Sequence, residues 1–115
     1  MNPDCPTCAK QWREVRGETF LARVLEIVAE SARLYGVPAS LILGRTRSQP
    51  VSDARQMAFL VARETIPGAT YDAIAQVFGR DHGTVMHGVL AATDRIKIEP
   101  LHAVVYVLMT NKFSV

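Results

Sequence analysis

Apolar residues recur along this chain three or four positions apart, which is the spacing that puts them on one face of a helix. Between residues 18 and 35, apolar residues at helical spacing include Leu21, Val24, Leu25, Val28, Ala32 and Tyr35. Gly36 follows at once, and glycine readily takes the left-handed conformation that ends many helices. The pattern therefore predicts a helix over 18–35.

Proline and glycine divide the middle of the chain. Pro38 opens a short helix that Gly44 closes, and a polar loop with two arginines covers 44–50. A helix over 51–66 follows, and its candidate N-terminal caps are Ser52 and Asp53. The positions expected to face the core are Ala54, Met57, Ala58, Val61 and Ala62. Those expected to point elsewhere are Arg55 and Arg63.

Two shorter helices come next, joined by a tight turn. Thr70 caps a helix that Gly79 ends, and Asp81 is placed to cap a second helix over 82–96. Their apolar faces contain Tyr71, Ile74, Ala75 and Phe78 in the first, and Val85, Val89, Ala92 and Ile96 in the second. Two short helices with a glycine-containing turn are typical of a helix-turn-helix.

The segment 101–109, LHAVVYVLM, is apolar on all sides, so periodicity cannot separate a helix from a strand. A terminal helix agrees better with the rest of the chain. The fold class predicted is all-α. With 115 residues we expect one folded domain, over 19–115, preceded by an N-terminal extension, 1–18, that could be mobile.

The net charge of +2 is unevenly distributed. Residues 33–63 carry five arginines and one acidic residue, a net +4, whereas each flanking part has a net charge of −1. A phosphate backbone could dock on the central part. The alternative is an ordinary solvated face rich in arginine, and charge alone favours that alternative.

Several classes of protein are disfavoured. The chain has no apolar run long enough to cross a membrane and no signal-peptide core, so a cytoplasmic location is expected. There is no Walker-type nucleotide motif. The only cysteines, Cys5 and Cys8, lack a second ligand pair for zinc. Two free thiols on a mobile N-terminus are the favoured interpretation, and a half-site shared by two chains is the alternative.

Residues 78–88, FGRDHGTVMHG, concentrate the chemistry of the chain. His82 and His87 are five positions apart and fall on different helix faces, so they are not expected to share a metal. An enzymatic site is weakly supported, because adjacent Asp81 and His82 do not face each other in a helix. Two interpretations stay open on this pattern: a recognition helix that enters a DNA major groove N-terminus first, and a capped surface helix with no partner.

Taken together, the RxRS loop, the ARQMA helix and the FGRDHGTVMHG run resemble the C-terminal DNA-binding domain (domain IV) of the bacterial replication initiator DnaA. The order and spacing of these motifs agree with that family. The resemblance begins near Leu21 and extends to the C-terminus.

The resemblance implies a helical fold like that of the Trp repressor and binding to double-stranded DNA at DnaA-box-like sites. In the loop it places Arg47 in the minor groove, with Arg45 beside it. It assigns phosphate contacts to Arg55, Gln56, Arg80 and Thr84, and base contacts to Asp81, His82 and His87. Alternatives are an internal salt bridge for Arg55, for example to Asp81, and a capping or packing role for His82.

The chain departs from the family at three places. Gly83 stands where the family usually has a threonine that contributes to reading the box, so this chain would read a modified box or bind more weakly. Gln49 and Asp53 stand where the family is often basic, which predicts fewer phosphate contacts and a shallower salt dependence. The initiator's ATPase domain is missing, so no nucleotide cofactor and no origin melting are expected.

The function expected from the sequence is that of a stand-alone, nucleoid-associated DNA-binding protein without a metal or cofactor. It would regulate replication initiation or transcription by occupying boxes. The alternative is a protein-interaction module on the same fold, with weak or non-specific DNA binding, whose segment 101–109 binds a partner or forms a dimer. An enzyme or metal protein built on the cysteines and histidines is the least favoured.

Overall fold

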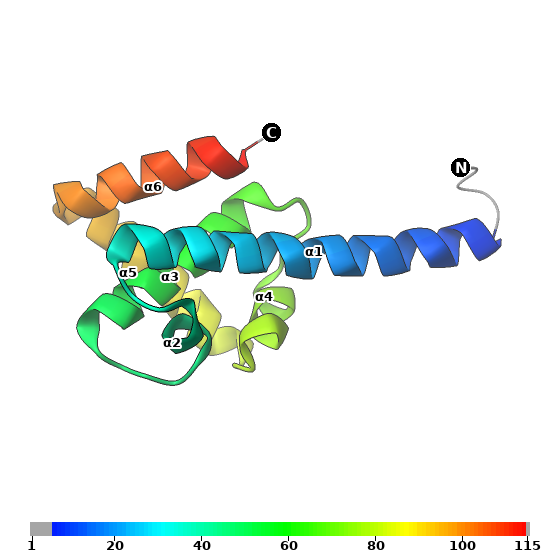
Figure 1. Ribbon diagram of the computed structural model, residues 1–115, viewed down its shortest axis with the longest axis horizontal. Helices are drawn as coiled ribbons and strands as arrows, with labels where there is room; N and C mark the ends of the chain where they lie inside the picture. The colour runs from blue at the N-terminus through cyan, green and yellow to red at the C-terminus, as the bar shows by residue number, and fades with distance from the viewer. Residues whose placement is uncertain (1–5, 115) are drawn as a thin grey trace.

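The computed structural model describes residues 6–114, and the side chains from residue 19 onward. Within that range the chain forms helices and no strand, as predicted (Figure 1). The helices are α1 (Pro6–Tyr35), α2 (Ala39–Leu43), α3 (Gln49–Thr65), α4 (Tyr71–Phe78), α5 (His82–Ile98) and α6 (Pro100–Phe113).

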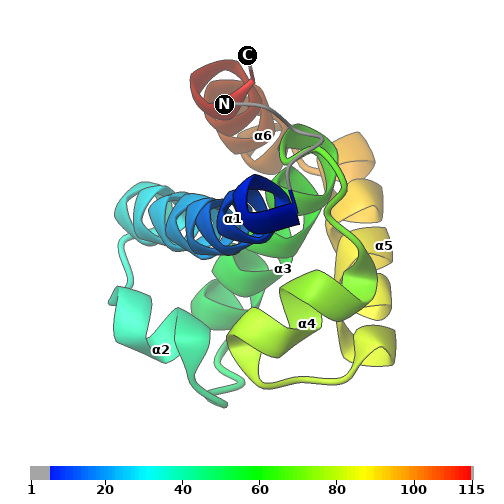
Figure 2. The ribbon, with the colours of Figure 1, turned by 90° about the vertical axis from the view of Figure 1, so that its right-hand side faces the viewer.

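Helix α3 is the centre of the fold. Figure 2 shows it enclosed by α1, α5 and α6, with α2 and α4 below it. Its middle turns are buried almost all round, as expected for a helix with neighbours on every side. The five residues predicted to face the core are all buried, and so are Val51, Phe59 and Leu60. The prediction that Arg55 points away from the core is wrong, since this residue is only 6% exposed.

The buried face of α1 is displaced from the predicted one. Val24, Val28 and Ala32 are buried as expected, but Leu21 and Leu25 are 46% and 41% exposed. Ile27 takes part in the core instead. Beside it lies Ser31, whose hydroxyl donates a 2.7 Å hydrogen bond to the Ala54 carbonyl. The core-facing stripe therefore includes a polar position that a search for apolar spacing does not count.

Helix α1 starts at Pro6, well before the predicted boundary. The backbone of residues 6–18, assigned to the extension, is thus part of this helix. Cys5 and the side chain of Cys8 lie outside the described residues, so the interpretation of these two thiols stays a prediction. The separate extension over 1–18 likewise stays a prediction.

Helix α3 also starts earlier than predicted, at Gln49 in place of Val51. Its N-cap is Ser48, and Pro50 occupies the first turn, where the missing amide proton of proline costs no hydrogen bond. The proposed caps Ser52 and Asp53 are wrong, because both lie inside the helix. The loop between α2 and α3 is shortened to residues 44–48.

Helices α4 and α5 form the predicted helix-turn-helix. The Thr70 hydroxyl accepts a hydrogen bond from the Ala73 amide at 3.1 Å, and Gly79 ends α4 in the left-handed region at φ 64°. Val85, Val89 and Ala92 are buried along α5, as predicted.

The apolar segment 101–109 is a helix, as favoured from the sequence. Met109 is buried on its inner side, and the Tyr106 hydroxyl and the Lys112 ammonium bond to Glu64 and Glu30. In both views α6 lies on the opposite side of α3 from α2 and α4. None of the described helices is long and apolar enough to span a bilayer.

Candidate nucleic-acid interface

The loop 44–48 and the turn between α4 and α5 lie on the same side of the molecule, away from α6 (Figures 1 and 2). A direct hydrogen bond joins them, because Nη2 of Arg80 donates to the Gly44 carbonyl at 2.7 Å. Gly44 and Arg80 are 36 positions apart in the chain, yet the basic loop and the turn that begins α5 form one surface.

Asp81 caps α5 as predicted. Its Oδ1 accepts hydrogen bonds from the Thr84 amide at 2.8 Å and from the Thr84 hydroxyl at 2.7 Å. These two bonds hold the pKa of Asp81 below its ordinary value, the side-chain bond contributing most. The carboxylate therefore stays charged at neutral pH and is held at the start of the helix, and the Thr84 hydroxyl is turned towards it.

His82 and His87 are exposed, as is Thr84, while Gly83 is partly exposed. His82 lies beside Asp72 of α4, with 3.8 Å between Nδ1 and Oδ1. Among the described residues, no three metal-ligating side chains come together, either beside His82 or elsewhere. An added Cβ at Gly83 would meet only Oδ1 of Asp81, at 3.7 Å, so the position is open towards solvent.

Arg45 and Arg47 project from the loop with exposed side chains. Neither forms an ion pair with a described carboxylate, whereas Arg33 and Arg95 do. Their charge is thus directed to solvent on the side that the start of α5 also faces.

Arg55 is placed quite differently from the loop arginines. Its Nε donates to the Ile42 carbonyl at 2.7 Å and its Nη1 to the Thr46 carbonyl at 3.0 Å. Its Nη2 donates to the carbonyls of Leu41 and Gly44. All four acceptors of Arg55 are main-chain oxygens. The alternative of an internal salt bridge to Asp81 is therefore wrong.

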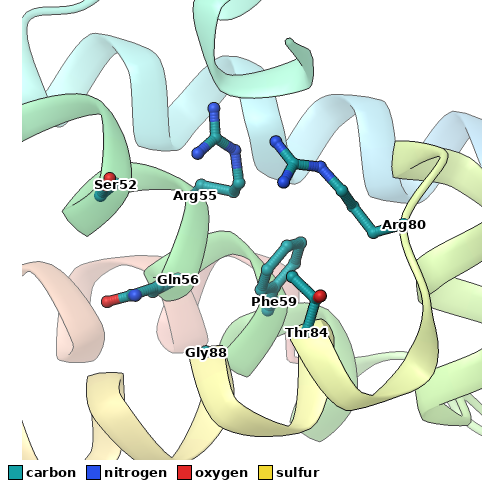
Figure 3. A pocket seen from close by; sticks show the side chains of 7 residues that line it. All are labelled: Ser52, Arg55, Gln56, Phe59, Arg80, Thr84 and Gly88. Carbon is teal, nitrogen blue, oxygen red and sulfur yellow. The ribbon is translucent and has the colours of Figure 1, made fainter. Parts of the chain in front are cut away.

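A small cavity of about 80 Å³ opens between α3 and α5 at this surface. Figure 3 shows the guanidinium groups of Arg55 and Arg80 side by side above Phe59 and Thr84. Burial and, after it, the charge of Arg80 lower the pKa of Arg55. No described carboxylate forms an ion pair with either arginine, so the two positive charges are suited to an anion. The residues lining this cavity are Ser52, Arg55, Gln56, Phe59, Arg80, Thr84 and Gly88.

Asp53 and Gln56 are held by groups that the sequence did not connect. Asp53 is buried and pairs with Arg95 at 3.2 Å, so its negative charge is not presented by the basic loop. The same Arg95 donates to Oε1 of Gln56 at 2.7 Å. Gln49, at the start of α3, donates to Asp53 at 2.7 Å. Arg95 therefore fixes both side chains, which the sequence does not show because Asp53 and Gln56 lie about forty residues earlier in the chain.

Comparison with known proteins agrees with this geometry. The family described as the bacterial dnaA protein helix-turn-helix matches residues 22–91, more than half of the chain. The chain is 33% identical over 94 residues to "Chromosomal replication initiator protein DnaA 1" of Chlamydia pneumoniae, covering 82% of this chain and 20% of that protein. It is 34% identical over 71 residues to the protein of the same name from Chlamydia trachomatis serovar D, covering 62% of this chain and 15% of that one.

A solved structure supports the same relationship. The crystal structure of a DNA replication initiation factor superposes with a TM-score of 0.72 at 26% identity, covering 90% of this chain and 32% of the other. The chain spans a fifth or less of the curated relatives described above. The family match over residues 22–91 runs from α1 through the loop 44–48 and α3 into the helix-turn-helix. The chain therefore belongs to the bacterial DnaA helix-turn-helix family.

Proposed function

We propose that this protein binds double-stranded DNA at specific sites of the DnaA-box type, with the start of α5 in the major groove and Arg47 in the adjacent minor groove. The observation that supports this most directly is the bond between Arg80 and Gly44, which brings the basic loop and the recognition helix onto one surface. Relatives named as chromosomal replication initiators support a role in replication or in transcription near such sites.

Each group on this surface then has a proposed contact with DNA. His87 and His82 are exposed at the start of α5, where side chains reach base edges. Asp81 accepts two hydrogen bonds through Oδ1, and its other carboxylate oxygen is available to a base amino group. The cavity beside Arg80 is suited to a backbone phosphate, which would set the register without reading sequence.

Charge on the rest of the surface agrees with this orientation. The loop arginines are unpaired by described carboxylates, whereas Asp53 is buried and paired with Arg95. Asp53 therefore does not offset the positive charge of the two loop arginines. Two exposed arginines in the loop favour docking on phosphate, with an affinity that falls as the salt concentration rises.

Fluorescence anisotropy with two duplexes tests this function, one carrying a DnaA box and one with the same bases scrambled, over a range of salt concentrations. We expect the box to bind about tenfold or more tightly, since one or two good base contacts give that discrimination. Arg47→Ala should weaken box binding, while Lys97→Ala, which removes the same charge from the far end of α5, should change it little. Equal affinity for both duplexes would reduce the function to non-specific DNA binding.

A second candidate function is protein interaction through α6, as a partner site or a dimer contact. The observation favouring it is the outer face of this helix, where Leu101 is 80% exposed and Val104, Val107 and Leu108 are each about half exposed. Sedimentation over a range of protein concentrations tests for a dimer. DNA binding that is absent while self-association is present would favour this function over the first.

A further inference from the structure

The guanidinium of Arg55 is the main attachment of the loop to the body of the protein. Its four acceptors, the carbonyls of residues 41, 42, 44 and 46, span the last turn of α2 and the first half of the loop. Carbonyls at the end of a helix have no partner within it and need one from elsewhere. A planar fork with several donors can bind such a set at once, whereas the single ammonium of lysine cannot.

Arg80 reaches the same loop from the other side. Its Nη2 donates to the Gly44 carbonyl at 2.7 Å, and Nη2 of Arg55 donates to the same oxygen at 3.0 Å. The backbone of Arg80 is itself fixed, because its amide donates to the Ala75 carbonyl at 2.9 Å across the left-handed turn at Gly79. One main-chain oxygen thus joins the central helix, the loop and the turn that begins α5.

We propose that Arg55 is a positioning residue: with Arg80 it fixes the loop at the distance from α5 that lets Arg47 reach the minor groove while α5 occupies the major groove. This inference rests on the proposed function. Arg55 acts on DNA through the loop and does not itself make the phosphate contact that the family resemblance assigns to it. Its 6% exposure and its four main-chain acceptors support this role.

The two roles predict different behaviour of one pair of substitutions. If Arg55 binds a phosphate directly, its contribution is independent of Arg47, and Arg55→Lys keeps much of it because lysine also binds phosphate as a point charge. If Arg55 positions the loop, lysine loses most of the carbonyl bonds and keeps the charge. Arg47 is then misplaced already, and removing it costs little more.

A double-mutant cycle on box affinity separates these roles, using Arg55→Lys, Arg47→Ala and the combined variant. We expect each single substitution to weaken binding about tenfold, and Arg47→Ala to cost less than about threefold further in the Arg55→Lys protein. The matched control is Arg63→Lys, on the same helix but bonded to Ala69 beyond its other end. In the Arg63→Lys protein, Arg47→Ala should weaken box binding about tenfold, as in the wild type.

Folding is checked separately, by circular dichroism and thermal unfolding, with binding measured well below every midpoint. Amide hydrogen exchange of residues 45–47 in the free protein should speed up in Arg55→Lys and not in Arg63→Lys. If Arg55→Lys does not fold, Arg80→Lys is taken through the same cycle, since it removes the other bond to Gly44.

If the two losses of box affinity multiply in the combined variant, the positioning role is wrong and the proposed function still stands. A wild-type protein that does not prefer the box, or one in which Arg47→Ala has no effect, overturns the proposed function and this inference with it.

Discussion

Gly88 of α5 lies directly against the ring of Phe59 of α3, and a Cβ at position 88 would come within 2.6 Å of Phe59 Cδ2. The same ring also packs edge to face with Phe78, with 4.7 Å between the two ring centroids. Helix α5 therefore approaches α3 as closely as a residue without a side chain permits. We expect Gly88→Ala to lower the free energy of unfolding by about 1–3 kcal/mol, the usual cost of overpacking, as measured by denaturant titration.

The other glycine of α5, Gly83, provides the control. Gly83→Ala adds the same methyl group where only Oδ1 of Asp81 lies near, at 3.7 Å, so it should stabilise by about 0.5–1 kcal/mol. Combining Gly88→Ala with Phe59→Leu should cost less than the sum of the two single changes, since the smaller side chain makes room. Equal effects of alanine at both glycines would contradict this account of the packing.

His87→Ala is expected to reduce specificity. Because the side chain is exposed and lies one turn into α5, its loss should weaken box binding by about 1–3 kcal/mol and weaken scrambled-duplex binding much less. Anisotropy titrations of both duplexes measure the ratio. Asn111→Ala, an exposed polar residue on α6, is the control and should change neither affinity. A uniform loss on both duplexes would assign His87 to phosphate contact.

Gly83→Thr tests whether the departure from the family pattern limits recognition. The open surroundings of Gly83 accommodate a side chain without disturbing the cap. The resemblance places a base-reading threonine here, so we expect tighter binding to a DnaA box and a larger preference over the scrambled duplex. Gly83→Ser, which lacks the methyl group, shows whether that gain comes from an apolar contact. An unchanged preference would mean that this chain reads a different site.

Glu30 is expected to make stability depend on pH in an acidic window. Bonds from Arg33 and then Lys112 lower its pKa from 4.5 to about 2. The folded protein thus favours the charged form, so the contribution is complete above pH 4.5 and is lost as the pH falls towards 2. Glu30→Gln should lower stability by about 1 kcal/mol at pH 7, a value kept small because both cations are largely exposed.

Thermal unfolding at several pH values checks this effect. The difference between wild type and Glu30→Gln should shrink between pH 4.5 and 2, whereas Glu26→Gln, an exposed position one turn earlier in α1, should differ little from wild type throughout. A difference that stays constant down to pH 2 would rule out the ion pairs as its source.

Substitutions at two neighbouring positions on α6 should differ greatly in their effect on stability. Met109 is fully buried, and Met109→Ala should cost about 2–5 kcal/mol. Leu108 is 52% exposed, and Leu108→Gln should change stability by no more than about 0.5 kcal/mol. Sedimentation of Leu108→Gln reports whether the outer face associates. A large loss of stability from Leu108→Gln would show that this face is covered within the folded protein.

The helix-turn-helix could be predicted because its signals are local. Thr70 and Asp81 each bond an amide three residues on, and Gly79 takes a conformation that glycine favours. A sequence displays such relationships directly. The exposed residues of the candidate interface follow from the same local pattern, since the buried stripe of α5 fixes which positions face outward.

The roles of Arg55 and Asp53 could not be predicted in this way. Arg55 bonds main-chain oxygens whose positions depend on where α2 and the loop are placed. Asp53 pairs with Arg95, 42 residues later, which no local pattern connects to it. The sequence therefore predicts that Arg55 points away from the core, although its main-chain partners allow it to be buried.

The shared acceptor at Gly44 also affects which sequence changes this surface tolerates. Because Arg55 and Arg80 bond a backbone oxygen, side chains at the exposed loop positions can vary without loosening the attachment. The number of residues between Leu41 and Thr46 cannot vary so freely, because one insertion or deletion would move the carbonyls out of reach of both guanidinium groups. Among relatives, loop length should therefore be kept more strictly than loop composition wherever both arginines are present.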